Sequence, residues 1–334
     1  MMWASYFLFL AKVVTLVVAF TVVLLLVISA RKAMPRSGTL KIRSLNEHYR
    51  SYRQNLQEWL LDDKALKLWW KQEKKRIKEE DEADRARVFV LNFEGDVQAS
   101  AVARLREEIT AVLEVARTDK DRVVLVLESP GGVVHGYGLA ASQLKRLRQA
   151  GLRLEICVDK VAASGGYMMA ALADQVLAAP FAVVGSIGVV AQLPNFNRLL
   201  RKHAVDIELH TAGAYKRTLT LLGENTEEGR QKFREELEST HALFKNWVQE
   251  ARPGLDLEKV ATGEHWYGQQ ALALGLIDAI ATSDEHLRQA AQTADVLEVR
   301  FHQPQHLLER LSHSVSLVVS NTLERVLNSV RLVP

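Results

Sequence analysis

Short apolar segments alternate with longer helical stretches from Val88 onward, and this alternation constrains the fold more than any other feature of the sequence. The apolar segments are rich in β-branched residues, so they are predicted to be strands. They cover residues 88–93, 123–128, 152–158, 183–190 and 207–211. Residues 226–251 are predicted to form a long helix, because two glutamates follow Thr226 and suit the positive end of a helix dipole. Strands separated by helices indicate an α/β domain.

A segment of 18 residues without charge, 13–30, lies near the start of the chain. As a helix it would be about 27 Å long, close to the thickness of a bilayer's hydrocarbon core, so we expect a membrane anchor. A cleaved signal peptide is the competing interpretation, but its apolar core would be shorter. Basic residues are more frequent after the segment than before it, where Lys12 stands. They are Arg31, Lys32, Arg36, Lys41 and Arg43. By the positive-inside rule, this places the C-terminal side in the cytoplasm.

The remainder of the chain divides by composition. Residues 1–12 form a short tail before the anchor, and residues 31–87 are densely charged and are predicted to form a helical stalk or linker. Residues 88–285 hold the alternating strands and helices of the main domain. In the extension 286–334, apolar residues recur at steps of three and four, which predicts an amphipathic helix. A further apolar stretch, 161–193, contains charge and proline, so we interpret it as buried core rather than a second span.

The composition argues against several classes of partner. The net charge is only +3, and no basic stripe with interleaved aromatic residues indicates a nucleic-acid partner. The single cysteine, Cys157, lies in a predicted strand and is expected to be a buried, small apolar residue. No His-Glu-x-x-His or paired Cys-x-x-Cys motif indicates zinc, and no other cofactor is predicted.

Ser164 and Lys216 carry the predicted chemistry. Ser164 stands between the apolar segment 152–158 and a run of small residues predicted to begin a helix, where N–H groups and the helix dipole stabilise an oxyanion. A lysine activates a serine only as a neutral amine, and lowering its pKa from about 10.4 to about 7.5 requires about 4 kcal/mol of desolvation. Lys216 follows Ala-Gly-Ala, which brings no charge and permits close packing. The plainer alternative is that Ser164 only caps a helix.

Glycines and a second serine stand at the ends of other apolar segments. Gly131 and Gly132 follow the segment 123–128, where free N–H groups can point into a crevice at a strand's carboxyl end. They are candidates for oxyanion donors, or they form an ordinary strand-to-helix turn. Ser186 lies between two glycines. It either positions the lysine amine or bonds its own backbone.

Four motifs in order resemble those of peptidase family S49, the signal peptide peptidase A and SohB family of serine peptidases. They are Ser-Pro-Gly-Gly at 129–132, Ala-Ser-Gly-Gly-Tyr at 163–167, Val-Gly-Ser-Ile-Gly at 184–188 and Tyr-Lys at 215–216. The resemblance covers about residues 85–285. It implies a Clp protease/crotonase-like domain behind the N-terminal transmembrane helix.

The resemblance also implies roles for individual residues. Ser164 would be the nucleophile and Lys216 the base, with Ser186 orienting the lysine. The oxyanion donors would be amides near Gly131, Gly132 and Gly165. Both dyad residues occur in one copy, without an internal repeat, which implies a homo-oligomer.

The expected function is a serine endopeptidase of the bacterial inner membrane, acting on extended or membrane-derived peptides such as signal peptides. This family role favours a periplasmic catalytic domain, whereas the charge distribution favours the cytoplasm. A Ser-His-Asp triad with His135 would be a different catalytic arrangement, although no Gly-x-Ser-x-Gly motif is present. A crotonase-type acyl-CoA hydratase or hydrolase is a second candidate, but it leaves the Ser/Lys pair unexplained. A third is a catalytically silent membrane scaffold that binds peptides or partner proteins.

Overall fold

The computed structural model describes residues 12, 15–16, 38–213 and 215–303. Most of the predicted anchor 13–30 lies outside these residues, as do all of the residues 307–330 whose spacing predicts an amphipathic helix in the extension 286–334. Within the described part of the chain, no helix combines the length and the apolar character that crossing a bilayer requires.

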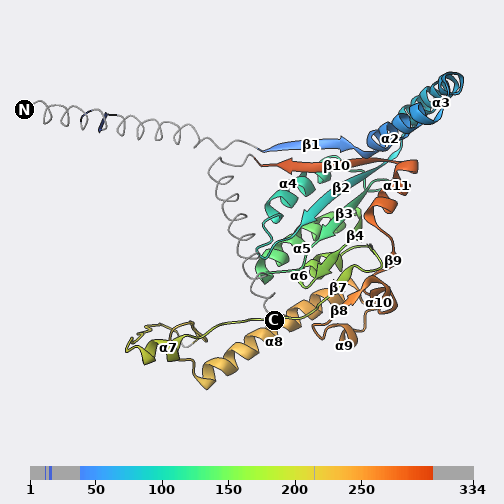
Figure 1. Ribbon diagram of the computed structural model, residues 1–334. Helices are drawn as coiled ribbons and strands as arrows, with labels where there is room; N and C mark the ends of the chain where they lie inside the picture. Colours follow the sequence, from blue (N-terminus) through green and yellow to red (C-terminus); the bar gives the residue numbers. More distant parts are fainter. Residues whose placement is uncertain (1–11, 13–14, 17–37, 214, 304–334) are drawn as a thin grey trace, which may run out of the picture. The chain divides into compact units, whose positions relative to one another are not determined.

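A seven-stranded sheet forms the centre of the protein, with the strand order β1-β10-β2-β3-β4-β6-β9 (Figure 1). Its members are β1 (Thr39–Ser44), β2 (Ala86–Glu94), β3 (Arg122–Glu128), β4 (Arg153–Val158), β6 (Gln175–Ala178), β9 (Ala279–Ile280) and β10 (Ala294–His302). From β10 to β9 every neighbouring pair is parallel. A second sheet contains β5 (Val161–Ala163), β7 (Val183–Gly185) and β8 (His265–Tyr267), in that order.

Helices cover both faces of the larger sheet, because successive side chains of a strand point to opposite faces. On β2, Phe89, Leu91 and Phe93 join the core formed with α4 (Val102–Leu113), α5 (Val134–Gln149) and α6 (Gly165–Ala170). Val88 and Val90 face the other way and join a core with α11 (Ser283–Thr293) and the first residue of α2. The result is the predicted α/β architecture, with the sheet between two helical layers.

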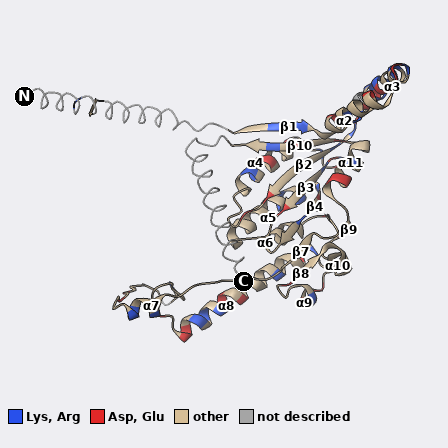
Figure 2. Ribbon diagram, viewed as in Figure 1, with Lys and Arg blue, Asp and Glu red and all other residues tan. Residues whose placement is uncertain are grey.

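The predicted stalk contains two helices, α2 (Leu45–Leu60) and α3 (Asp63–Glu82). Their starts are capped by the side chains of Ser44, which accepts from Glu47 N, and Asp62, which accepts from Lys64 N and Ala65 N. Figure 2 shows charges of both signs along the pair. One of the ion pairs, Arg50–Glu80 at 3.1 Å, ties the two helices together.

The C-terminal half of the domain adds α8 (Glu227–Ala251), α9 (Leu257–Val260) and α10 (Gly268–Ala273). The long helix is where it was predicted, and Thr226 caps it by accepting from Gly229 N. Phe244 and Val248 bury its C-terminal part in the main core. The described residues of 189–226 contain the short helix α7 (Asn197–Lys202) as their one regular element, and they lie beside the N-terminal end of α8 in Figure 1.

Some sequence predictions need correction. The strand predicted at 207–211 is wrong: these residues are exposed, and the described chain offers them no neighbouring strand to pair with. The strand predicted at 183–190 ends at Gly185, because Ser186 turns the backbone with a φ of 52°. The sheet also extends beyond 88–285, since β1 comes from the predicted stalk and β10 from the predicted extension.

Candidate active site

Ser164 stands where β5 meets α6, at the helix N-terminus predicted from the sequence. Its backbone has φ 51° and ψ −117°, a conformation that non-glycine residues seldom adopt and that is common at functional sites. The conformation is held from outside, because Ser164 N donates to Gly185 O at 2.8 Å. The hydroxyl does not cap the helix. The Ser164 hydroxyl therefore makes no capping hydrogen bond and has no hydrogen-bond partner among the described residues.

Gly131 lies directly against this serine. A Cβ at Gly131 would be 2.7 Å from Ser164 Cβ and 2.8 Å from Ala163 O, and the residue also has a φ of 91°. Both the space and the conformation therefore require glycine. The loop after β3 thus reaches the helix N-terminus that bears Ser164.

The three backbone N–H groups that were predicted to be oxyanion donors differ in whether they already have an acceptor. The N–H of Gly131 is already used, since it donates to Ser129 Oγ at 3.1 Å. Gly132 N and Gly165 N have no acceptor within the described part of the chain. Gly165 is the first residue of α6, where N–H groups lack partners in the helix itself. Among the predicted donors, Gly132 N and Gly165 N are thus the two that the described chain leaves without an acceptor.

The glycines after Ser164 allow α6 to pack closely on its neighbours. A Cβ at Gly165 would lie 2.3 Å from Tyr137 Cγ, and one at Gly166 would lie 2.6 Å from Ser129 O. The motif Ser-Gly-Gly therefore sets the serine close to both the loop after β3 and the start of α5.

Ser186 is brought next to Ser164, because it follows the Gly185 whose carbonyl accepts from Ser164 N. Its own N–H donates to Glu264 O at 2.7 Å, and its hydroxyl donates to Gly263 O at 3.4 Å. The backbone of Ser186 also has a positive φ, of 52°. The site thus contains two serines with positive φ on adjacent turns of the backbone.

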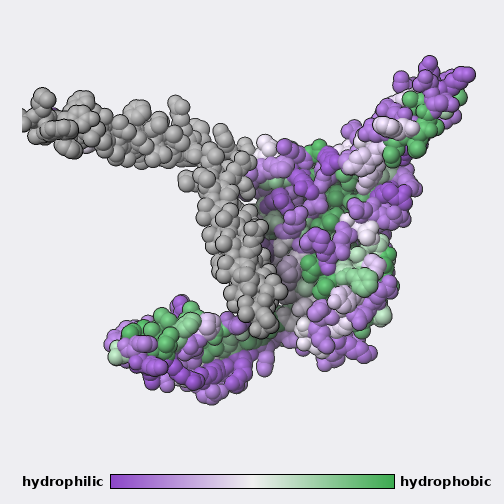
Figure 3. Space-filling model, viewed as in Figure 1, coloured by the Kyte–Doolittle hydropathy of each residue, from purple (hydrophilic) through white to green (hydrophobic). Residues whose placement is uncertain are grey.

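Lys216 is not joined to this group within the protomer. The side chain is exposed, and its ammonium makes no hydrogen bond or ion pair with the described residues. Residues 189–226 carry exposed apolar side chains such as Val190, Leu199 and Leu209. Figure 3 shows hydrophobic residues gathered in the region of α7. The burial that a neutral lysine base requires is therefore not supplied at this position by its own protomer.

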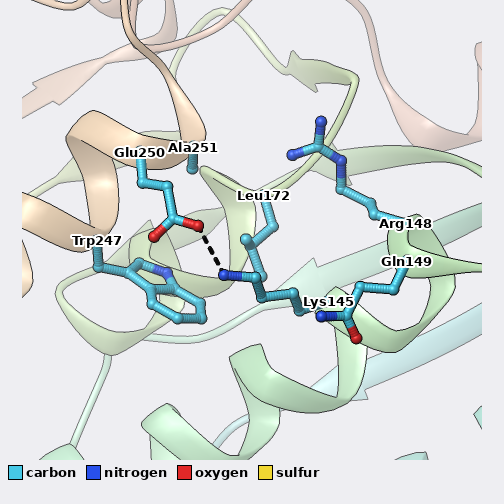
Figure 4. A pocket seen from close by; sticks show the side chains of 7 residues that line it. All are labelled: Lys145, Arg148, Gln149, Leu172, Trp247, Glu250 and Ala251. Carbon is cyan, nitrogen blue, oxygen red and sulfur yellow. Dashed lines mark hydrogen bonds and ion pairs between the residues drawn. The ribbon is translucent and has the colours of Figure 1, made fainter.

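Three further features lie outside the group around Ser164. His135 is exposed in the first turn of α5, away from the environment that a catalytic triad needs. Cys157 is buried in β4 as predicted, and burial raises the pKa of its thiol to about 12. A surface cavity of about 220 Å³ lies between α5 and α8 (Figure 4). Its Lys145 is already engaged, with Nζ 2.7 Å from Glu250 Oε1 and 5.1 Å from the centre of the Trp247 ring.

Sequence reasoning missed the hydroxyl groups behind the glycine loop. Ser129 and Tyr137 are both fully buried, and their oxygens lie 2.6 Å apart. The Ser-Pro-Gly-Gly motif contained a signal for Ser129, because a hydroxyl before two glycines is able to bond their backbone. Nothing in the sequence indicated Tyr137, which comes close through folding.

Comparison with known proteins assigns the chain to a family. The family model Peptidase family S49 N-terminal matches residues 2–144, and Peptidase family S49 matches residues 146–297. The chain therefore belongs to peptidase family S49.

Within that family the chain is SohB-like. It is 47% identical to the Probable protease SohB of Haemophilus influenzae over 96% of this chain and 95% of the relative. It is 46% identical to the Probable protease SohB of Buchnera aphidicola, over 96% of each chain. A solved structure of the membrane-bound stomatin-specific protease 1510-N, with a substrate peptide, matches with a TM-score of 0.43 and 13% identity, over 70% of this chain and 99% of that one.

Proposed function

We propose that this SohB-like peptidase is a membrane-anchored serine endopeptidase with Ser164 as nucleophile and Lys216 as base. The observation that carries the proposal is Ser164 itself, with a strained backbone, an unused hydroxyl and two unpaired N–H groups beside it within the described chain. Such a site suits attack on a carbonyl whose oxygen becomes negative. No cofactor is needed for this reaction.

The reaction has two stages. Ser164 Oγ attacks the peptide carbonyl carbon while the neutral Lys216 amine takes the hydroxyl proton, and Gly132 N and Gly165 N donate to the oxyanion. The C–N bond then breaks, and the lysine ammonium returns its proton to the leaving amine, which leaves an acyl-enzyme. Water, deprotonated by the same lysine, hydrolyses that ester and regenerates the serine.

Lys216 would reach Ser164 from a second copy of the chain. This part of the proposal is supported by the exposed position of Lys216 and by the exposed apolar side chains of residues 189–226, which a neighbouring copy would cover. Contact with the neighbour would also remove the lysine from water and favour its neutral form. The active enzyme is then a homo-oligomer, with Ser186 orienting the incoming amine.

Substrates would be extended, apolar peptides released in or near the bilayer, such as cleaved signal peptides. The anchor at 13–30 would hold the enzyme at the bacterial inner membrane. Digestion of spheroplasts with an added protease reports the side of the catalytic domain: degradation of the full chain indicates the periplasm, and protection until lysis indicates the cytoplasm.

The chemistry is tested by labelling the purified full-length protein with a fluorophosphonate and locating the adduct by mass spectrometry. We expect an adduct at Ser164 in the wild type and none in Ser164→Ala or Lys216→Ala. A folded oligomer that stays unlabelled would refute the nucleophile and favour the peptide-binding scaffold.

The origin of the lysine is tested by co-expressing Ser164→Ala with Lys216→Ala, because each variant keeps the residue that the other lacks. If the dyad forms between copies, random mixing restores about a quarter of the sites. If it forms within one copy, the mixture stays as inactive as the separate variants.

A further inference from the structure

Behind the loop that touches Ser164, buried groups form one continuous hydrogen-bonded chain. Gly131 N donates to Ser129 Oγ at 3.1 Å, Ser129 Oγ lies 2.6 Å from the phenol oxygen of Tyr137, and Tyr137 donates to Asp96 O at 2.8 Å. Both side chains have no exposed surface. The chain of hydrogen bonds therefore ties the loop after β3 to the start of α5 and to the loop after β2.

The direction of every proton in these hydrogen bonds follows from the two ends. An N–H such as that of Gly131 can only donate, and a carbonyl such as that of Asp96 can only accept. The hydroxyl of Tyr137 donates its one proton to Asp96 O, so in the bond between the two hydroxyls Ser129 is the donor and Tyr137 the acceptor. Burial raises the pKa of the Tyr137 phenol, which keeps it a donor. With one orientation available, the hydrogen bonds hold a single arrangement of the loop.

The loop after β3 is also hydrogen-bonded to the loop after β2. Val133 N donates to Val97 O and Gly95 N donates to Glu128 O, both at 2.8 Å. A Cβ at Gly132 would lie 2.1 Å from Val97 O, so the backbone of Gly132 is pressed against the loop after β2. The position of Gly132 N consequently depends on the position of the loop after β2, which is held by the hydrogen bond from Tyr137 to Asp96 O.

We infer that Ser129 and Tyr137 are positioning residues for the oxyanion hole, which hold the Gly131–Gly132 peptide so that Gly132 N faces the Ser164 hydroxyl. The inference rests on the proposed function of Ser164. Neither side chain contacts the substrate, and both act through the backbone. An oxyanion donor contributes in the transition state, so losing its alignment lowers kcat and leaves KM nearly unchanged.

The test uses the full-length protein carrying Tyr137→Phe, Ser129→Ala or both substitutions. Fluorophosphonate labelling rates of Ser164 are measured together with kcat and KM for an internally quenched apolar peptide. Removing an oxyanion donor outright lowers kcat by about 100- to 1,000-fold, so misplacing one is expected to lower it by about 10- to 100-fold. The double variant should lose little more than either single one, because all three break the same set of hydrogen bonds.

Tyr167→Phe is the matched control. Tyr167 is also fully buried, and its phenol donates to a backbone carbonyl, Leu276 O, at 2.9 Å. Both Tyr→Phe changes remove a buried hydroxyl that is hydrogen-bonded to backbone, so both should lower the unfolding temperature. The decrease should be larger for Tyr137, which loses two hydrogen bonds, than for Tyr167, which loses one. Only Tyr137→Phe should lower kcat and the labelling rate.

The outcomes separate this inference from the proposed function. A wild type that is not labelled at Ser164 overturns both. A labelled wild type whose Tyr137→Phe and Ser129→Ala variants react at the same rate overturns the positioning role alone. Equal losses of kcat in Tyr137→Phe and Tyr167→Phe also overturn it, because the loss would then follow from lower stability of the fold and not from the position of the oxyanion donor.

Discussion

Replacing Gly131 by alanine is the most direct test of the contact between the glycine loop and Ser164. The new Cβ would lie 2.7 Å from Ser164 Cβ and 2.9 Å from Gly165 N, and the backbone would keep a φ of 91°. A non-glycine residue in a sparsely populated conformation costs about 1–3 kcal/mol. Overpacking adds about 1–3 kcal/mol, so we expect Gly131→Ala to be destabilised by about 2–6 kcal/mol.

Gly138→Ala provides the matched comparison, because Gly138 lies inside α5 and an added Cβ there meets nothing within 4 Å. Alanine in a helix interior is favoured over glycine by about 0.5–1 kcal/mol, so this variant should be slightly stabilised. For a domain of this size, 1 kcal/mol corresponds to about 2–4 °C in Tm. Gly131→Ala should therefore melt at least about 4 °C below the wild type, and Gly138→Ala at or slightly above it.

Thermal unfolding of the full-length protein in detergent, followed by tryptophan fluorescence, measures both shifts. Fluorophosphonate labelling below the transition then reports the site: Gly131→Ala should react slowly even while folded, and Gly138→Ala at the wild-type rate. Wild-type stability and labelling in Gly131→Ala would refute the close contact between the glycine loop and Ser164.

Three further predictions concern buried groups. Although burial opposes ionisation, hydrogen bonds from Arg117 and Arg87 hold the pKa of the Asp121 carboxyl below its usual range. The contribution of Asp121 to the free energy of unfolding is therefore complete above about pH 4 and is lost as the pH falls further. Asp121→Asn should lower the free energy of unfolding by about 3 kcal/mol at pH 7, and denaturant titrations should show that its stability depends less on acid pH than that of the wild type. Burial raises the pKa of the Glu108 carboxyl, so its contribution to stability falls as the pH rises through that pKa. The wild type should thus lose stability relative to Glu108→Gln as the pH rises above about 4, and a stability difference that does not change with pH would contradict the assignment. Cys157, with its pKa raised to about 12, should react with a thiol reagent at about pH 8 only as fast as the protein unfolds, whereas rapid labelling of the native protein would show that β4 is accessible.

The sequence predicted the fold best where the residues of a single segment are enough to indicate its secondary structure and burial. The strands β2, β3 and β4 are largely apolar, with few polar interruptions, and such segments are typical of strands covered on both faces. The strands β1 and β10 were missed because their pairing joins residues about 250 positions apart. The apolar signal of β1 is also short, since only Leu40 and Ile42 alternate with polar residues.

For the candidate site, the sequence indicated which residues to consider but not their conformation or contacts. Residue type and order pointed to Ser164, but only its backbone angles, held by Gly185, distinguish a free hydroxyl from a helix cap. The role of Tyr137 depends on a contact made by folding. The exposure of Lys216 could not be read from its neighbours Ala212 and Gly213, which suit a buried lysine equally well.

The position of β10 in the sheet determines when the sheet can be completed during synthesis of the chain. It lies between β1 and β2, although it is the last strand of the described chain. Until residues 294–302 have left the ribosome, β2 has an open edge on that side, and β1 lacks the neighbour that the finished sheet gives it. The sheet is thus completed only after residues 294–302 have been synthesised, long after residues 13–30 have emerged. The proposed anchor at 13–30 would thus leave the ribosome before the sheet is complete, and a truncation before residue 294 would leave a strand edge open to aggregation.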